Sequence, residues 1–374
     1  MKRVSYIFPT SHHYRKPFHE KLRLLLAERN VDYRVVYCDP KAENIKKNDT
    51  VDIDWGVKVG TKTLPFGLEY QCGFREALKS DMVIVQQENK LVLNYMLNIL
   101  SMLGAKRLAY FGHGRNFQSR NPSGLSERWK RLWATKVNWW FGYTEETRRH
   151  VVSLGFPSDN ITVFNNSVDT SQLRGQVERI TPERLQVLRA ELGLAGRNVG
   201  VFVGGIYPDK RMAFLIEACE RIRSRIPDFE LLVVGGGADL PVIEALAKSR
   251  PWVRVLGPRF GVEKVELMML GHVFMMPGLM GLAILDAAVV GLPIATTRYP
   301  WHSPEIAYLD VDRNGVMVDE WENSQAYADA VSGILVDAAV QQSMAAEARA
   351  MADRYSIERM AENFAAGVLR ALDA

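Results

Sequence analysis

The sequence predicts an α/β protein built from two domains with parallel sheets, and three observations predict it. Short apolar runs typical of buried strands alternate with amphipathic segments typical of helices along most of the chain. The alternation is interrupted by segment 170–197, which is charged and helical in pattern and contains no strand signal. The chain has 374 residues, enough for two domains that each bury a core.

In the first half, the first predicted helix shows the clearest periodicity. Phe18, Leu22, Leu25 and Leu26 fall on one face of segment 17–28. The strands expected here are 3–8, 33–37, 82–85, 107–111, 141–144 and 161–164. The helices expected after the first are 91–103, 125–140 and 145–154. Segment 41–70 is polar and irregular, and we expect it to leave the sheet as a long excursion.

The second half repeats this alternation. Its expected strands are 199–203, 230–234, 253–256, 273–276, 294–297 and 315–318. Helices are expected at 211–226, 241–248 and 261–270, with further helices filling the end of the chain. Strands separated by helices predict parallel sheets that are covered on both faces.

Composition narrows the class of protein. The chain is 47% hydrophobic and 24% charged, with a net charge of +4, which is too weak to indicate nucleic-acid binding. Its three cysteines lie far apart, which predicts a reducing compartment and no disulfide framework. No apolar run reaches the roughly 18 residues that a membrane span needs. We therefore expect a soluble cytoplasmic protein without a nucleic-acid partner.

The stretch from Pro277 to Pro293 is the most informative. A strand ends at Pro277, a glycine-bearing loop follows, and a helix then begins. The backbone N–H groups of Gly281, Leu282 and Ala283 would lie at that helix start, where they suit a phosphate. Asp286, about one turn further on, would reach a ribose hydroxyl. An ordinary strand–helix–strand unit with a tight turn explains the same pattern.

The second half resembles the retaining GT-B glycosyltransferases of family 4. The resemblance rests on five segments that occur in the family's order: 203–211, 231–237, 253–257, 277–293, and 304–306 with 314–318. It implies the GT-B fold, in which two Rossmann-like, doubly wound parallel-sheet domains face a central cleft. The implied organisation is an acceptor-binding domain at 1–168, a linker at 169–198, a nucleotide-sugar-binding domain at 199–350, and a final helical segment, 351–374, that returns to the first domain.

The resemblance also implies roles for particular residues. Lys210 falls on the lysine that clamps the donor diphosphate, in a loop that includes Gly204. Gly205 stands where that family usually has an arginine, and Arg211 is the neighbouring candidate to replace it. His113 falls near a histidine that faces the donor sugar, so His113 and Lys210 are the catalytic candidates.

Three further residues are candidates for the donor site. Glu305 is expected near the donor, and Arg259 near the base. His302 is a weaker candidate. Gly278 occupies the position of the family's first paired glutamate and Asp286 that of the second, which resembles a bacterial subgroup with a Pro-Gly-x-x-Gly-Leu loop.

The first half supplies acceptor candidates. The loop after the first strand contains His12, His13, Tyr14, Arg15 and Lys16, and part of it resembles a loop of the same subgroup. Segment 125–140 would place Trp129, Leu132, Trp133, Val137 and Trp140 on one face of a basic helix, which is typical of peripheral membrane contact and also of a core helix.

The expected function is transfer of a sugar, with retention, from a nucleotide-diphosphate sugar to a glycan or lipid-linked acceptor in bacterial surface-polysaccharide assembly, at the inner face of the plasma membrane. No cofactor or metal is expected, because the two Asp-x-Asp pairs, 52–54 and 310–312, lack the strand setting of a metal site. Two alternatives stay open: a nucleotide-sugar 2-epimerase of the same fold, and a non-catalytic partner of another transferase.

Overall fold

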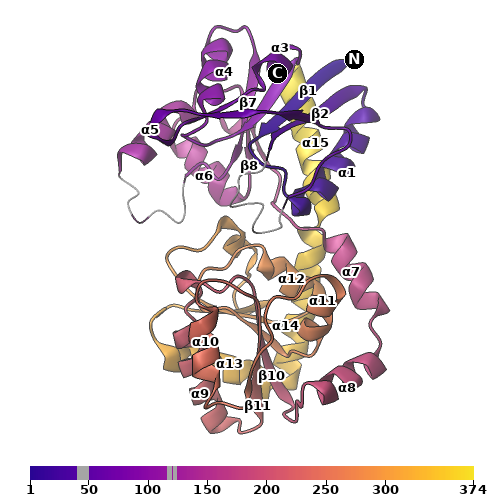
Figure 1. Ribbon diagram of the computed structural model, residues 1–374, viewed down its shortest axis with the longest axis vertical. Helices are drawn as coiled ribbons and strands as arrows, with labels where there is room; N and C mark the ends of the chain where they lie inside the picture. Colours follow the sequence, from indigo (N-terminus) through magenta and orange to yellow (C-terminus); the bar gives the residue numbers. More distant parts are fainter. Residues whose placement is uncertain (40–49, 116–119, 121–123) are drawn as a thin grey trace. The chain divides into compact units, whose positions relative to one another are not determined.

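The computed structural model describes residues 1–39, 50–115, 120 and 124–374. The chain divides into two compact units (Figure 1). The first contains Met1–Asp169 together with Ile357–Ala374, and the second contains Thr170–Ser356.

Within the described residues, the main sheet of the first unit has seven strands, all parallel, in the order β3-β2-β1-β6-β7-β8-β9. These strands are β1 (Lys2–Phe8), β2 (Val31–Cys38), β3 (Val57–Val59), β6 (Met82–Gln86), β7 (Arg107–Gly112), β8 (Trp139–Gly142) and β9 (Ile161–Val163). The strand order reverses between β1 and β6, so the sheet has its switch point there.

Helices cover both faces of this sheet, and two apolar clusters form its core. One cluster joins the sheet to α1 (Lys16–Ala27) and to α15 (Ile357–Asp373), which lies against α1 (Figure 1). The other cluster includes residues of α3 (Phe74–Leu78), α4 (Val92–Met102) and α6 (Glu145–Ser153). The first unit therefore has the covered parallel sheet that the sequence predicts.

The contact of α15 with the sheet is very close. A methyl group on Gly367 would lie 2.4 Å from the Thr162 Oγ1 atom and 2.7 Å from the Phe141 ring. The Phe364 ring stacks on Phe141 with 4.0 Å between ring centroids. Glycine at this helix position lets the last helix become part of the core of the first unit.

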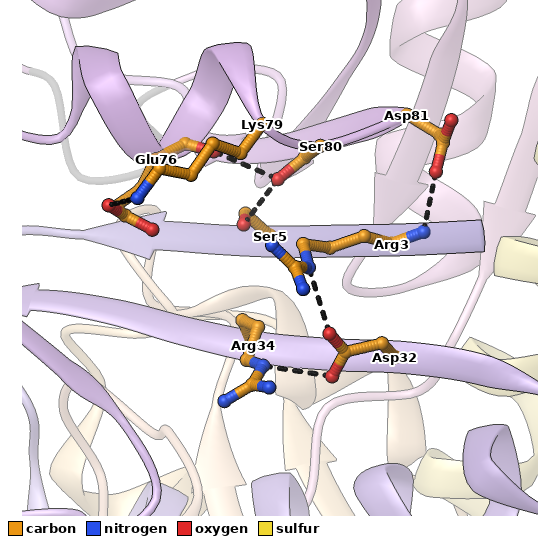
Figure 2. Close-up of polar contacts among 8 residues, drawn as sticks. All are labelled: Arg3, Ser5, Asp32, Arg34, Glu76, Lys79, Ser80 and Asp81. Atoms are coloured by element: carbon orange, nitrogen blue, oxygen red, sulfur yellow. Dashed lines mark hydrogen bonds and ion pairs between the residues drawn. The ribbon is translucent and has the colours of Figure 1, made fainter. Parts of the chain in front are cut away.

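A network of polar side chains connects the amino-terminal ends of neighbouring strands in this sheet (Figure 2). The Asp32 carboxylate accepts hydrogen bonds from the Nε atoms of Arg3 and Arg34, each at 2.8 Å. Ser5 and Ser80 share a hydrogen bond of 2.7 Å, and the Asp81 carboxylate accepts from the Arg3 backbone N–H at 2.6 Å. These bonds join β1 to β2 and to the residues before β6, and so help to set the register of three strands.

The segment expected to be an irregular excursion contains more structure than the sequence predicts. Its described part supplies β3 to the main sheet, and β4 (Thr61–Thr63) pairs with β5 (Glu69–Gln71) in a small antiparallel sheet. A short helical turn, η2 (Pro65–Gly67), connects β4 and β5. These strands are only three residues long, too short for a period-two pattern to stand out.

The helix predicted over 125–140 is also wrong in its second half. Helix α5 contains only Leu125–Ala134, and β8 begins at Trp139. Val137 and Trp140 are buried core residues, and the Trp140 indole N–H donates to the Ala134 carbonyl at 2.7 Å. The alternation that suggests one long helical face therefore spans a helix, a turn and a strand.

The second unit, whose residues are all described, has a six-stranded parallel sheet in the order β12-β11-β10-β13-β14-β15. Its strands are β10 (Asn198–Val203), β11 (Phe229–Val234), β12 (Val253–Val255), β13 (Val273–Met275), β14 (Ile294–Thr297) and β15 (Gly315–Val318). The order reverses between β10 and β13, which sets the switch point of this sheet.

The helices of the second unit are α7 (Thr170–Arg179), α8 (Pro182–Glu191), α9 (Met212–Arg225), α10 (Leu240–Ala247), α11 (Gly261–Met269), α12 (Ala283–Val290), α13 (Ser324–Val336) and α14 (Ala338–Arg354). The segment expected to be a linker thus forms α7 and α8. Helix α7 packs against α11 and α12, so this segment is part of the second unit.

Candidate functional site

The loops that follow β10 and β13 meet at the switch point of the second sheet. The Leu279 backbone N–H donates to the Asp209 carbonyl at 2.8 Å, and the Asp209 carboxylate accepts from the Tyr299 hydroxyl at 2.6 Å. In parallel α/β sheets, ligands bind outside the carboxyl ends of the strands at this point. The glycine loop and the lysine loop that the sequence singles out are therefore neighbours.

Lys210 lies between these two loops. Its side chain is buried, and its Nζ atom donates to the Leu279 carbonyl and lies 3.4 Å from the Met276 sulfur. Burial lowers the pKa of this lysine to about 8, which the nearby Asp209 carboxylate partly opposes. A buried ammonium whose charge is only partly compensated is suited to an anion that approaches the loops.

The structure explains the glycine at position 278. A Cβ atom there would lie 2.0 Å from the Asp209 carbonyl oxygen, which is backbone and hydrogen-bonded. Glycine is thus required for the two loops to approach as closely as they do. Gly205 differs, because a Cβ atom at that position would meet only the Tyr207 ring, at 3.0 Å.

The helix after the glycine loop is α12. Leu282 is its N-cap residue and makes no side-chain capping bond. Gly281, Leu282 and Ala283 are partly exposed, and the first N–H groups of a helix have no partner within the helix. The three residues thus lie at the start of α12, and their binding of a phosphate stays a prediction.

Asp286 lies in the first turn of α12, and one of its carboxylate oxygens accepts from the Lys264 Nζ atom at 2.8 Å. Glu305 is buried in the short helical turn η5 (Pro304–Tyr308). Arg259 is exposed and lies 3.7 Å from the Glu263 carboxylate. Gly204 follows β10 with a φ of 155°.

Arg211, the candidate to replace the family's usual arginine, contacts the glycine loop. It adopts a left-handed conformation with φ of 58° directly before α9. Its guanidinium donates to the carbonyls of Pro277 and Trp321 and lies 4.0 Å from the centre of the Phe214 ring. In this arrangement the side chain is hydrogen-bonded to Pro277, at the start of the glycine loop.

His302 is the supporting residue that sequence reasoning ranked lowest. Its Nδ1 atom accepts from the Met280 backbone N–H at 2.9 Å, and its Nε2 atom lies 2.8 Å from the Thr297 carbonyl. A carbonyl only accepts, so the proton must be on Nε2 and the ring must be neutral. Burial lowers its pKa to about 4. The sequence could not predict these two hydrogen bonds, because they depend on how the fold brings the backbone of Met280 and Thr297 to the ring.

The candidate acceptor residues gather at the switch point of the first sheet. A cavity of about 280 Å³ there is lined by Tyr6, Phe8, Pro9, Thr10, His12, Tyr14, Arg15, His19, Glu69, Gln86, Glu88, Lys90, Phe111 and Tyr143. Three of the five predicted acceptor residues, His12, Tyr14 and Arg15, line it; His13 and Lys16 do not. Glu69 and Glu88 are additions that the sequence reasoning missed, although Glu88 follows a predicted strand end.

His113 directly follows β7. Its ring lies 3.9 Å from that of Tyr143, which lines the cavity. Burial, together with the cations Lys130 and Arg15, lowers the pKa of His113 to about 3, so the ring is neutral at neutral pH. It can offer a hydrogen bond and carries no charge.

Residues of both Asp-x-Asp pairs contact other side chains of the protein. Asp52 accepts from Tyr37 and Lys58, and Asp310 pairs with Arg313, each at 3.2 Å. Among the described residues, no group of three or more His, Cys, Asp or Glu side chains is placed to hold a metal ion. The described helices also include none long and apolar enough to cross a membrane.

Comparison with known proteins shows which family the second unit resembles. Residues 197–337, which contain β10, both loops and α12, match the family described as "Glycosyl transferases group 1". This segment of the chain is therefore similar to that family. The match confirms the resemblance seen in the sequence, and it covers the segment on which that resemblance rests.

Two curated relatives are similar to this chain over about half its length. The D-inositol 3-phosphate glycosyltransferase of Corynebacterium urealyticum is 30% identical over 216 residues, which are 54% of this chain and 49% of that protein. A GDP-mannose-dependent phosphatidylinositol monomannoside mannosyltransferase of Mycolicibacterium smegmatis is 28% identical over 204 residues, 51% of each. The chain spans about half the length of the curated relatives it matches.

A solved structure matches almost the whole chain. HepE of Anabaena, determined in complex with UDP, superposes with a TM-score of 0.72 at 16% identity, covering 99% of this chain and 100% of that one. The likeness at this identity shows the fold. The predicted GT-B class is confirmed.

Replacing Gly278 with alanine should destabilise the second unit by about 2–3 kcal/mol, because the added methyl group meets a fixed backbone carbonyl. Gly281→Ala is the matched control, since its nearest neighbour is the Ser303 hydroxyl at 3.3 Å, which can rotate away. Urea unfolding of both variants measures the difference. Equal, small effects would show that the two loops are not tightly joined.

His302 should make the stability of the second unit depend on pH. Its folded pKa of about 4 lies below its usual value, so its stabilising effect is present above pH 6.5 and is lost as pH falls towards 4. The full difference is roughly 3 kcal/mol. In His302→Gln, whose amide can make both bonds without titrating, urea unfolding between pH 7.5 and pH 4.5 should show a weaker pH dependence than the wild type. An unchanged pH dependence would contradict this.

Proposed function

We propose that the chain transfers a sugar, with retention of anomeric configuration, from a nucleoside-diphosphate sugar to a glycan or lipid-linked acceptor. One observation supports this above the others: Lys210 and the amides of residues 281–283 lie at one switch point, beside a loop that only glycine permits. In the proposed reaction the bond between the anomeric carbon and the diphosphate breaks, and the diphosphate leaves with negative charge.

The residues of the second unit would stabilise that charge. The ammonium of Lys210 is fixed by Leu279 before any ligand arrives, so little reorganisation is needed as charge develops. The amino terminus of α12 adds donors and a favourable dipole. Asp286 and Glu305 are proposed to contact the ribose and the donor, while Arg211 and His302 hold the loop. Arg259 is proposed to lie near the base.

The first unit would hold the acceptor. His113 is proposed to donate a hydrogen bond to a sugar hydroxyl, and its low pKa makes it a neutral donor. His12, Tyr14 and Arg15 line the cavity proposed for the acceptor. His13 and Lys16 are their neighbours in the chain and are also proposed to contact the acceptor. The proposed mechanism needs no enzymic nucleophile, since the acceptor hydroxyl attacks from the face that the diphosphate leaves.

The relatives indicate which donors to try first. The structure of HepE contains UDP, and the mycobacterial mannosyltransferase is named for GDP-mannose. We further propose a role in bacterial surface-polysaccharide assembly at the inner face of the plasma membrane.

Thermal unfolding with nucleoside diphosphates and their sugars tests the donor site. A ligand that binds only the folded state raises the melting temperature. We expect either UDP or GDP to raise the melting temperature, and we expect EDTA not to change this effect. Loss of the rise in EDTA would contradict a metal-free site, and turnover of the sugar without any acceptor into its 2-epimer would favour the epimerase alternative.

Lys210→Ala should lower kcat/KM by an amount equal to about 2–4 kcal/mol in the barrier, if the lysine acts like one donor of an oxyanion hole. Lys248→Ala, which removes an exposed lysine of the same unit, is the control and should not change the rate. Release of nucleoside diphosphate measures both. Nucleotide binding by the wild type without any turnover would support the non-catalytic alternative.

Membrane contact is proposed through α5 (Leu125–Ala134) alone, since Val137 and Trp140 are in the core. Leu125 and Leu132 are 82% and 56% exposed, and Trp129 lies between them on the helix. Arg128 and Arg131 are exposed on the same helix and suit anionic headgroups. Together these residues form an apolar and basic surface.

The double substitution of Leu125 and Leu132 by serine should reduce sedimentation with phosphatidylglycerol vesicles. The matched control replaces Leu24 and Leu103, which are equally exposed elsewhere on the first unit. We expect binding to phosphatidylglycerol and little to phosphatidylcholine. Equal loss in both double variants, or no binding by the wild type, would exclude α5 as the contact.

A further inference from the structure

We propose that the cavity at the switch point of the first sheet binds the phosphate-ester group of a small polyhydroxy acceptor, with Arg15 as its anchor. The inference rests on the proposed function and specifies its acceptor. The phosphate ester is either that of a free sugar or polyol phosphate or that of a lipid headgroup, and both sources present the same chemistry to Arg15.

Arg15 is a buried cation whose charge is not compensated by an acid. Only 8% of the residue is exposed. Its guanidinium donates hydrogen bonds to the Tyr143 hydroxyl at 3.3 Å and the Met360 sulfur at 4.0 Å, and its side chain is also hydrogen-bonded to that of Tyr14. Within the part of the chain that the structure describes, it forms no ion pair with a carboxylate. A guanidinium has five N–H donors, so donors remain for a ligand.

The surroundings of Arg15 keep the charge uncompensated. The rings of Tyr14 and Tyr143 lie 5.1 Å and 5.6 Å from its guanidinium carbon and attract the cation only weakly. His19 is buried beside it, and burial together with the Arg15 charge lowers the pKa of His19 to about 3. A buried charge is costly unless it is paired, and a bound anion would pair it.

The helix that follows Arg15 also favours an anion in the cavity, because its amino terminus lies there. Arg15 is the N-cap of α1, whose first turn contains no acidic residue. The cavity is lined by residues on both sides of this helix start, Tyr14, Arg15 and His19. The positive end of the helix dipole therefore adds to the charge of Arg15, and guanidinium groups bind phosphate oxygens in a bidentate manner.

The rest of the lining suits hydroxyl groups. Glu69 and Glu88 line the same cavity, and the Lys90 Nζ atom lies 3.8 Å from one carboxylate and 3.2 Å from the other. Carboxylates accept hydrogen bonds from hydroxyls, and lysine donates to them. A cavity of about 280 Å³ is at the lower limit of small-molecule sites. It fits one phosphorylated sugar or polyol better than an oligosaccharide.

Calorimetry with the full chain tests this. The probes are glucose, glucose 6-phosphate and glycerol 3-phosphate for the soluble source, and phosphatidylcholine vesicles with and without phosphatidylinositol for the lipid source. We expect the phosphorylated probes to bind the wild type at least tenfold more tightly than glucose. Preference for the phosphatidylinositol vesicles over both soluble phosphates would assign the phosphate to a lipid headgroup, and the reverse would assign it to a free ester.

Arg15→Gln should weaken binding of the preferred phosphate by about ten- to a hundredfold, with Arg15→Lys in between. Arg23→Gln, on the exposed side of the same helix, is the matched control and should bind like the wild type. Equal affinity for glucose and its phosphate in the wild type would overturn the inference even if the variants failed to fold.

The outcomes also separate this inference from the proposed function. A nucleotide-induced rise in melting temperature and sugar transfer, without any preference for phosphorylated probes, would overturn the Arg15 site and leave the transferase intact. Phosphate binding that depends on Arg15, without nucleotide binding or transfer, would support the anion site and contradict the transferase.

Discussion

The contact between the loops after β10 and β13 is the constraint on which the second unit's site depends. The Asp209 carbonyl occupies the space that a side chain at position 278 would need, and it accepts the Leu279 N–H at 2.8 Å. This closeness brings the Leu279 carbonyl within reach of Lys210 and fixes the start of α12. Arg211 and His302 then hold the same loop from other directions. The glycine that departs from the family's usual glutamate is thus a geometric requirement.

Both units place a buried cation at the switch point of their sheet, but different groups hold that cation in each unit. Each sheet reverses its strand order once within its described part, and each presents a buried cation at that point, Lys210 in one and Arg15 in the other. Lys210 is held by a backbone carbonyl, whereas Arg15 contacts phenol rings and a sulfur. The difference matters because a carbonyl fixes the direction of a donor, while aromatic rings leave the direction of a guanidinium to the ligand.

Much of this could be predicted from the sequence, because buried strands and glycine loops leave local signals. The apolar runs predicted the strands of both main sheets apart from β3, and the 277–293 pattern predicted the start of α12. The predictions that failed concern features that depend on contacts between residues far apart in the chain. Nothing near Trp140 distinguishes a helix face from a strand core, and the three-residue β3 is stabilised by its neighbour β2. The roles of His302 and Arg211 depend on carbonyls of residues 277, 297 and 321, which sequence reasoning cannot bring together.

The closeness of Gly367 to β9 has a consequence for biosynthesis. Phe364 and its neighbours on α15 complete the core of the first unit, yet they follow the whole second unit in the chain. The second unit, residues 170–356, is fully synthesised before α15 emerges. The first unit, although it begins to be translated first, therefore cannot finish its core until the second unit has been synthesised, and until α15 is translated one face of its sheet is covered only in part.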